Sequence, residues 1–209
     1  MTGARLPDPA LISPPTTALV VQEAQRGVIG DESALPELAR AVASAGVIER
    51  MARLAGAARA AGVPVVHATA ENLPGGFGVN RNARLFEAAR RAGADNRPGS
   101  SSVTPVPELG PEPGDVVLPR YHGLSPMTGG PLDSLLRNEG VTTLVVVGVS
   151  LNVAIPNLVF DAVNRSYRVV VPTDAVAAVP LEYGDHVLRH SLGLVATLVT
   201  TDDLVEAWG

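Results

Sequence analysis

Short apolar runs that alternate with stretches of helical spacing constrain this chain more than any other feature. Thr143–Val149 (TLVVVGV) is the strongest run, and Thr17–Gln22 (TALVVQ) and Val65–Ala68 are apolar almost throughout. A strand that is apolar on both faces is typical of a parallel sheet covered by helices on each side. Further strands are expected at 116–118, 168–171 and 196–199. The pattern therefore predicts an α/β fold with an open, doubly wound, mostly parallel sheet of about six strands.

Helical spacing fills several of the intervals between these strands. Residues 47–61 place apolar side chains on one face, and Gly62 and Pro64 follow with the usual chemistry of a helix end. Further helices are expected at 83–92, 132–138, 152–164 and 181–192, with a last helix capped by Thr201.

The remaining segments read as connections. Residues 27–46 are polar and punctuated by glycine, and residues 93–115 form a long loop that is typical of a lid or an interface element. Residues 1–16 lack any apolar period, so we expect an N-terminal arm followed by a single domain over residues 17–209.

Composition excludes several chemistries. The chain contains no cysteine, and all 16 of its Lys and Arg residues are arginine. A thiolate nucleophile, a disulfide, a thiolate metal site and a Schiff-base lysine are therefore ruled out. No cofactor motif is recognisable, because the glycine-rich run LPGGFG lacks the order and position of a dinucleotide-binding loop.

Charge and hydropathy bear on partners and location. The net charge of −5 lacks the basic footprint of a nucleic-acid-binding protein. No apolar run approaches the ~18 residues of a membrane span, and no signal peptide is visible, so we expect a cytoplasmic protein. Only 18% of the residues are charged, which favours additional burial in a homodimer or higher homo-oligomer.

Polar residues stand where the predicted strands end. In open α/β sheets, ligands bind beyond the carboxyl ends of the strands. The candidates for binding a small molecule at this edge are Gln25, His67, Glu71, His122, Ser150, Asn152 and Val153, beside Glu23 and Arg120.

The order of these segments resembles the isochorismatase-like hydrolases. That family begins with a strand ending in Asp-x-Gln, matched here by Glu23 and Gln25 in ALVVQEAQRG, and carries Gly-Val-x-x-Asn-x-Cys, matched by GVSLNVAIPN from Gly148. The stretches PRYHGLSPMTGG and FDAVNRSYRVVVPTDAVA follow the family pattern as well. The resemblance extends from Thr17 to the C-terminus and implies a three-layer α/β/α, Rossmann-like fold.

The resemblance also shows where the chain departs from the family. The family hydrolyses substrates with an Asp, a Lys and a Cys; these positions hold Glu23, either Pro119 or Arg120, and Ala154. A methyl group cannot attack a carbonyl, so the covalent route of the family is excluded.

Two functions stay open at this point. True isochorismatases dispense with the cysteine and protonate a vinyl ether, which suggests a non-covalent hydrolase of a small carboxylate-bearing metabolite with Glu23 as acid or base. The alternative is a catalytically inactive member that serves as a small-molecule-binding or oligomeric scaffold protein. Arg120 either neutralises Glu23 or clamps a substrate carboxylate.

Backbone groups supply a further expectation. Free N–H groups at Asn152, Val153 and Ala154, where a helix begins, suit a carbonyl oxygen or an anion. By the family resemblance, the Val149–Ser150 peptide is expected to be cis.

The remaining histidines carry weaker hypotheses. His67 is more simply a hydrogen-bonded core residue, although it is also a candidate for orienting Glu71 or a ligand. His122 lies three residues from Ser125, but no nucleophile elbow surrounds them. Glu182, His186 and His190 share a helix face without a further ligand cluster, so no metal site is expected.

Overall fold

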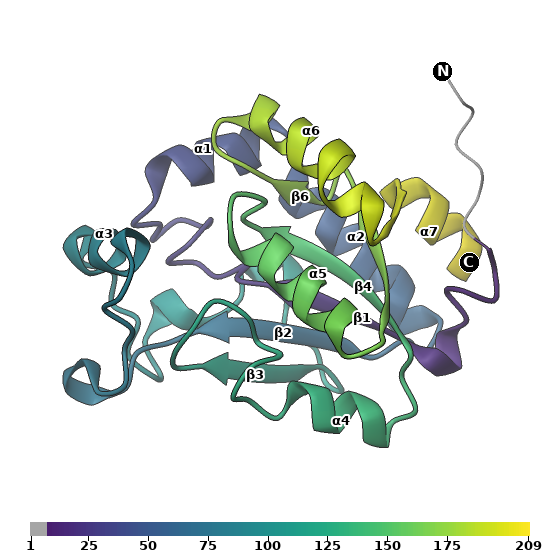
Figure 1. The fold of residues 1–209 in the computed structure, drawn as a ribbon, viewed down its shortest axis with the longest axis horizontal. Helices are drawn as coiled ribbons and strands as arrows, with labels where there is room; N and C mark the ends of the chain where they lie inside the picture. The colour runs from purple at the N-terminus through teal and green to yellow at the C-terminus, as the bar shows by residue number, and fades with distance from the viewer. Residues whose placement is uncertain (1–7) are drawn as a thin grey trace.

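The computed structural model of the protein describes residues 8–209 and contains a seven-stranded sheet in which every pair of strands is parallel (Figure 1). The strands are β1 (Thr17–Gln22), β2 (Val65–Ala70), β3 (Val116–Arg120), β4 (Thr143–Val149), β5 (Arg168–Pro172), β6 (Val176–Ala177) and β7 (Thr197–Val199). Their order is β3-β2-β1-β4-β5-β7, with the short β6 paired to β4. The open parallel sheet expected from the apolar runs is confirmed.

Helices cover both faces of the sheet. The helices are α1 (Pro36–Ser44), α2 (Val47–Ala60), α3 (Arg84–Ala92), α4 (Leu132–Asn138), α5 (Ala154–Asn164), α6 (Leu181–His190) and α7 (Thr201–Trp208). Along β1, Leu19 and Val21 join one apolar core with α1, α2 and α7, while Val20 joins the other with α4, α5 and α6. Because alternate side chains of a strand point to opposite faces, continuous apolar strands fill both cores at once.

Helix α3 differs from the others because none of its residues is buried. It stands at one end of the molecule, apart from the two helical layers (Figure 1). Its position makes it a wall of the cavity described below rather than part of a core.

Several predicted boundaries need correction. Residues 27–46 contain the helix α1, which the sequence reading took as a connection; its buried residues are Leu38 and Val42. Two buried positions in nine residues give too weak an apolar period to be recognised. The strand β6 was also missed, and α5 begins at Ala154 rather than at 152.

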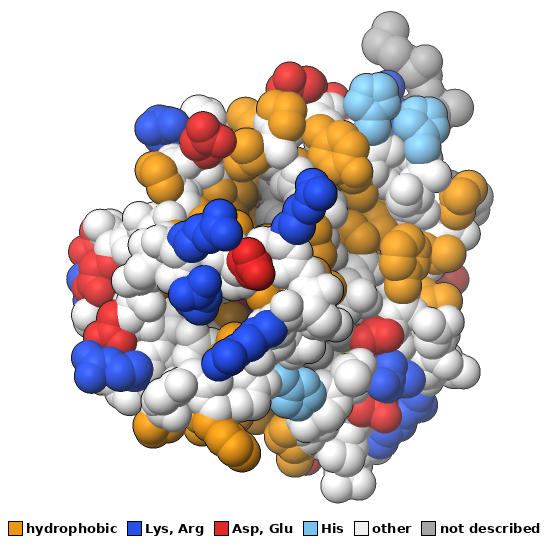
Figure 2. All heavy atoms as spheres, turned by 60° about the vertical axis from the view of Figure 1, so that its left-hand side comes forward, with side chains coloured by type: hydrophobic (Ala, Val, Ile, Leu, Met, Phe, Trp, Pro, Cys, Tyr) orange, Lys and Arg blue, Asp and Glu red, His pale blue; other side chains and the backbone are white. Residues whose placement is uncertain are grey.

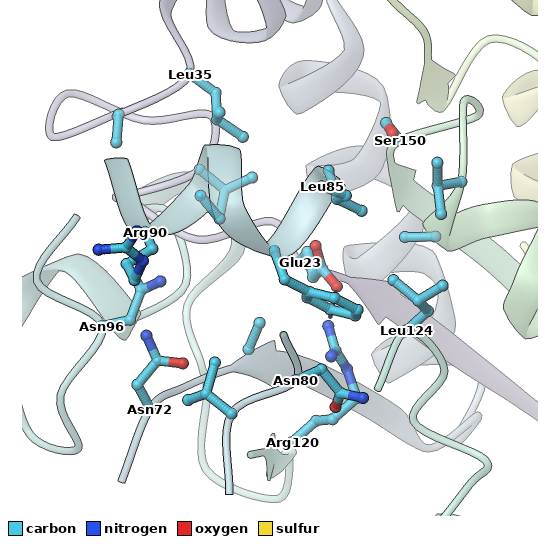
Figure 3. A pocket seen from close by; sticks show the side chains of 18 of the residues that line it. Glu23, Leu35, Asn72, Asn80, Leu85, Arg90, Asn96, Arg120, Leu124 and Ser150 are labelled. Atoms are coloured by element: carbon cyan, nitrogen blue, oxygen red, sulfur yellow. Dashed lines mark hydrogen bonds and ion pairs between the residues drawn. The ribbon is translucent and has the colours of Figure 1, made fainter. Parts of the chain in front are cut away.

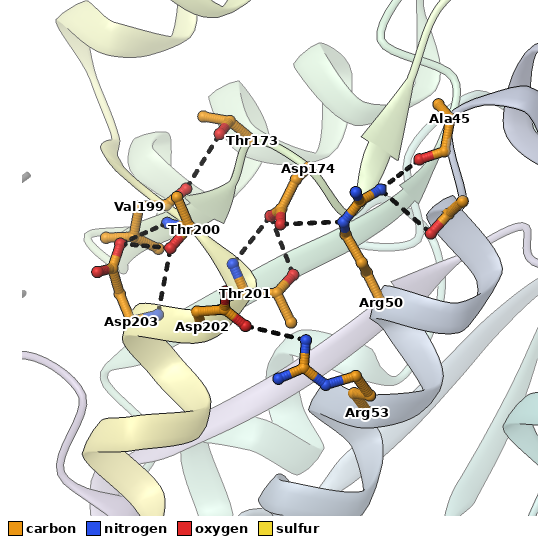
Figure 4. Close-up of polar contacts among 11 residues, drawn as sticks. Ala45, Arg50, Arg53, Thr173, Asp174, Val199, Thr200, Thr201, Asp202 and Asp203 are labelled. Atoms are coloured by element: carbon orange, nitrogen blue, oxygen red, sulfur yellow. Dashed lines mark hydrogen bonds and ion pairs between the residues drawn. The ribbon is translucent and has the colours of Figure 1, made fainter.

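The last helix is capped one residue earlier than predicted. The Thr200 hydroxyl accepts a hydrogen bond from the Asp203 N–H at 3.2 Å, and the Asp203 carboxylate accepts one from the Thr200 N–H at 2.7 Å (Figure 4). Thr201 instead donates from its N–H and its hydroxyl to Asp174, which also pairs with Arg50 of α2 at 3.3 Å. These contacts fix the start of α7 against β5 and α2.

The N-terminal arm is only partly described, since residues 1–7 lie outside the described residues. The Ile12 side chain is buried in the apolar core that the sheet forms with α1, α2 and α7. The Ile12 carbonyl accepts a hydrogen bond from Trp208 Nε1 at 2.9 Å. No helix among the described residues combines the length and apolar character needed to cross a membrane.

Candidate functional site

The carboxyl ends of four neighbouring strands bring the predicted polar residues to one edge. Gln22 pairs in register with Ala68 of β2 and Gly148 of β4, and Ala70 pairs with Arg120 of β3. The backbone turns at Glu23, whose φ is +51°, and the Glu23 N–H donates to the Ala68 carbonyl at 2.9 Å. The strand register therefore places Glu23 between the ends of β2 and β4.

A large cavity opens at this edge. Its volume is about 1050 Å³, and the space-filling view shows arginine side chains around a hollow in which hydrophobic side chains are visible (Figure 2). Eight of the ten predicted site residues line it: Glu23, Glu71, Arg120, His122, Ser150, Asn152, Val153 and Ala154. The structure thus brings together most of a set that spans 132 positions of sequence, from residue 23 to residue 154.

Glu23 and Arg120 form an ion pair inside this cavity (Figure 3). Their side chains are only 18% and 13% exposed, and Glu23 Oε1 also accepts a hydrogen bond from Gln22 Nε2 at 2.9 Å. Arg120 donates in addition to the carbonyls of His122 and Gly123. Glu23 Oε1 is thus engaged by two donors, whereas no residue of the described chain donates to Oε2.

The start of α5 offers backbone donors to the same cavity. The Val149–Ser150 peptide is cis, as expected, and the Ser150 carbonyl accepts hydrogen bonds from the N–H groups of Val153 and Ile155. The expectation of a free N–H at Val153 is therefore wrong. The Ala154 N–H has no acceptor within residues 8–209. A free N–H at the first residue of a helix is suited to an oxygen that carries negative charge.

Two further candidates face the cavity in different roles. The Asn152 side chain is already used, because it donates to the Val179 carbonyl at 2.7 Å and accepts from the Val179 N–H at 2.9 Å. Asn152 therefore shapes the wall of the cavity rather than offering a free amide.

Glu71 also lines the cavity. Burial raises the pKa of the Glu71 carboxyl, and a hydrogen bond from Thr69 opposes that shift.

Two predicted binding residues lie away from the cavity. Gln25 is buried and clamps the end of β2 by donating to the Ala70 carbonyl and accepting from the Ala70 N–H at 2.7 Å. His67 lies in the middle of β2, where its Nε2 donates to Asp115 Oδ2 at 3.0 Å. The simpler reading of His67 as a hydrogen-bonded core residue describes this arrangement.

The other histidine and serine hypotheses receive no support from the geometry. Ser125 is buried and its hydroxyl accepts from the Met127 N–H at 3.2 Å. The rings of His186 and His190 stack with centroids 5.8 Å apart, and no group of three His, Cys, Asp or Glu residues in the described chain is arranged to hold a metal ion.

Sequence reasoning missed the far wall of the cavity. Leu35 and Leu38 of the α1 region, Leu85 and Arg90 of α3, and the amides Asn72 and Asn96 line it. Scattered apolar side chains and one of several arginines on a polar helix carry no local signal of a binding site. Only the placement of α1 and α3 beside the sheet edge reveals them.

Comparison with known proteins identifies the family. Residues 17–203 match the isochorismatase domain family. This chain belongs to the isochorismatase family. It is similar to the ureidoacrylate amidohydrolase RutB of Methylobacterium radiotolerans, with 36% identity over 183 residues that span 81% of this chain and 70% of that protein. A RutB of Pseudomonas syringae pv. syringae is 31% identical over 81% of this chain and 74% of its own length.

Solved structures share the fold. A cysteine hydrolase from Pseudomonas syringae pv. phaseolicola has a TM-score of 0.82 and 23% identity, covering 100% of this chain and 98% of its own. An isochorismatase family protein from Desulfovibrio vulgaris has a TM-score of 0.79 and 26% identity, covering 91% of this chain and 97% of its own. The three-layer fold implied by the resemblance is therefore confirmed.

Proposed function

We propose that this isochorismatase-family chain is a hydrolase that activates water with Glu23 and acts on a small, carboxylate-bearing metabolite without a covalent enzyme intermediate. The observation that carries the proposal is the Glu23–Arg120 ion pair in the cavity, which leaves Glu23 Oε2 without a donor. The names of the relatives, amidohydrolases, favour an amide or ureido bond as the bond that is cleaved.

The ion pair favours a base over an acid. Oε1 accepts from both Arg120 and Gln22, and Oε2 remains to take a proton from water. The water oxygen would then bond to the substrate carbonyl carbon, and the developing oxyanion would accept from the Ala154 N–H. Transfer of the proton from Glu23 to the leaving nitrogen completes hydrolysis to an acid and an amine.

The substitutions at the family positions are consistent with such a route. By the family resemblance, Glu23 keeps the charge of the family Asp, Arg120, one of the two candidates for the Lys position, carries a positive charge, and Ala154 lacks the nucleophile. Glutamate reaches one methylene further than aspartate, and water needs space that the Ala154 methyl leaves free. The same general base therefore acts on water in place of a thiol.

A second function is favoured by one specific observation. Arg120 donates both to Glu23 and to the Gly123 carbonyl, which occupies the guanidinium that would otherwise clamp a substrate carboxylate and suits a small-molecule-binding protein without turnover. Saturable binding combined with no hydrolysis of any ligand would support this alternative.

The experiment measures hydrolysis of a panel of small amides, ureido compounds and vinyl ethers that carry a carboxylate. Glu23→Gln should lower kcat at least about 100-fold, the lower range for loss of a general base. Glu37→Gln is the matched control, since Glu37 also lines the cavity but belongs to α1. Turnover that survives Glu23→Gln would show that Glu23 is not the base.

A further inference from the structure

The cavity has a second polar end, remote from the Glu23–Arg120 pair. Figure 3 shows Arg90, Asn72 and Asn96 gathered at one end, with Glu23, Arg120 and Ser150 at the other. The Asn72 N–H donates to the Asn96 carbonyl at 2.7 Å, which holds the two amide side chains beside each other. We call Arg90, Asn72 and Asn96 the distal cluster.

The polar side chains of the distal cluster are available to a ligand. No carboxylate of the described chain lies within ion-pair distance of Arg90, and no hydrogen bond within residues 8–209 uses its guanidinium. The adjacent Arg91 pairs with Glu87 at 3.2 Å and does not line the cavity. A guanidinium beside two side-chain amides supplies a fork of N–H donors that matches a carboxylate.

The cavity also has apolar lining side chains, which include Leu35, Leu38, Leu85, Phe86 and Leu124, and Figure 3 shows Leu85 and Leu124 near the Glu23 end. A volume of about 1050 Å³ is slightly above the ~300–1,000 Å³ that pockets for drug-sized ligands have. The cavity thus suits a ligand with an apolar body and a polar group at each end.

The distal cluster would prefer a carboxylate because of where its donors lie, and not because of the net charge of the cavity. Two cavity arginines, Arg81 and Arg90, lack an acidic partner in the described chain, and two cavity carboxylates, Glu37 and Glu71, lack a cation. These charges balance, so no broad positive field attracts anions. A carboxylate would be bound only where the Arg90 guanidinium and the two amides can reach it together.

We propose that the distal cluster is a carboxylate subsite, and that the ligand is an amide whose far end carries the carboxylate beyond an apolar chain. The amide end then lies at Glu23 and the Ala154 N–H, and the acid end lies at Arg90. The orientation of the amide rests on the proposed function, whereas the distal subsite does not require turnover. The ligand would therefore be longer than the Glu23 end of the cavity alone can hold. Its amide and its carboxylate would be bound at opposite ends of the cavity.

Calorimetric binding of six probes tests the subsite: succinamic, adipamic and suberamic acids, and the methyl ester of each. At least one acid should bind the wild-type chain more tightly than its neutral ester, and added salt should weaken the binding of the acid only. Arg90→Gln should raise the Kd of that acid about tenfold, in line with loss of a charge-assisted hydrogen bond, and leave the ester unchanged. Arg91→Gln, which removes the neighbouring arginine, should change neither constant.

Three results would overturn the subsite: esters that bind as tightly as acids, equal weakening of acid and ester by Arg90→Gln, or no binding of any probe at millimolar concentration. The test is independent of hydrolysis. Acids that bind through Arg90 without being hydrolysed support the subsite and contradict the proposed function. Turnover that is lost in Glu23→Gln but unchanged in Arg90→Gln contradicts the subsite alone.

Discussion

Asp115 provides a stringent test of how burial determines the contribution of an ion pair to the stability of this fold. The Asp115 side chain is 4% exposed and receives Arg59 Nη2 at 2.7 Å, His67 Nε2 at 3.0 Å and the Glu112 N–H at 3.0 Å. Burial opposes its ionisation, but these hydrogen bonds, with that of Arg59 the strongest, lower the pKa of Asp115 to about 2. We predict that Asp115→Asn destabilises the fold strongly at neutral pH.

The magnitude follows from the lowered pKa. A fall from the ordinary value of 3.8 to about 2 corresponds to roughly 2 kcal/mol of stability for the ionised form. Removing one partner of a buried pair typically costs about 3–5 kcal/mol, and here the loss is at the lower end because Arg59 keeps Glu112 as a partner at 3.1 Å. We therefore expect Asp115→Asn to cost about 3 kcal/mol at pH 7, a fall in Tm of roughly 6–12 °C for a chain of this size.

The pH dependence has a definite sign. Because the folded pKa of Asp115 lies below the unfolded one, its stabilisation is complete above about pH 4 and is lost as the pH falls toward about 2. The neighbouring His67 has a pKa lowered mainly by burial, so it stays neutral in the folded chain near pH 7. The stability difference between wild type and Asp115→Asn should therefore shrink as the pH falls from 4 to 2.

Urea unfolding followed by the fluorescence of the single tryptophan, Trp208, measures these differences at each pH. The matched control is Asp95→Asn. The Arg97 side chain lowers the pKa of Asp95 to about 2 as well, but the Asp95 side chain is 45% exposed and its pair is screened by water. A measurable loss for Asp95→Asn, or a constant difference for Asp115→Asn across pH 4 to 2, would refute the argument from burial.

Two further predictions concern the backbone. A Cβ at Gly148, whose φ is +110°, would lie 2.1 Å from the Gln22 carbonyl oxygen. Gly148→Ala should therefore destabilise the fold by about 3 kcal/mol or more, measured by thermal unfolding. Gly56→Ala in α2, where a Cβ meets open space, should stabilise the fold by about 0.5–1 kcal/mol. Equal effects of the two would contradict the close approach of β1 and β4. Thr200→Ala should cost about 1 kcal/mol, because the hydroxyl that accepts from Asp203 is lost, and Thr200→Ser should recover most of it; a silent Thr200→Ala would mean that this cap is unimportant.

The sequence was sufficient to predict the layers and the edge of the sheet at which the site lies. Strands such as Thr17–Gln22 and Thr143–Val149 are buried at every position and apolar at most of them, which is typical of a sheet covered by helices on both faces. The absence of cysteine and lysine from the sequence equally excluded a thiolate or a lysine amine at any site, because no fold can supply an absent side chain. These conclusions depend on residue type and on local order alone.

Tertiary structure decided which polar groups meet. Glu23 pairs with Arg120, 97 positions away, because parallel register brings the ends of β1, β2 and β3 together. The sequence left His67 either as a hydrogen-bonded core residue or as a residue that orients Glu71 or a ligand. The 3.0 Å contact between His67 Nε2 and Asp115 Oδ2 fits the core role. The distal cluster around Arg90 had no local pattern, since it depends on where α3 lies beside the sheet edge. Apolar periodicity is a local property and is visible in the sequence, whereas the partner of a polar side chain is fixed by neighbours that only folding brings into contact.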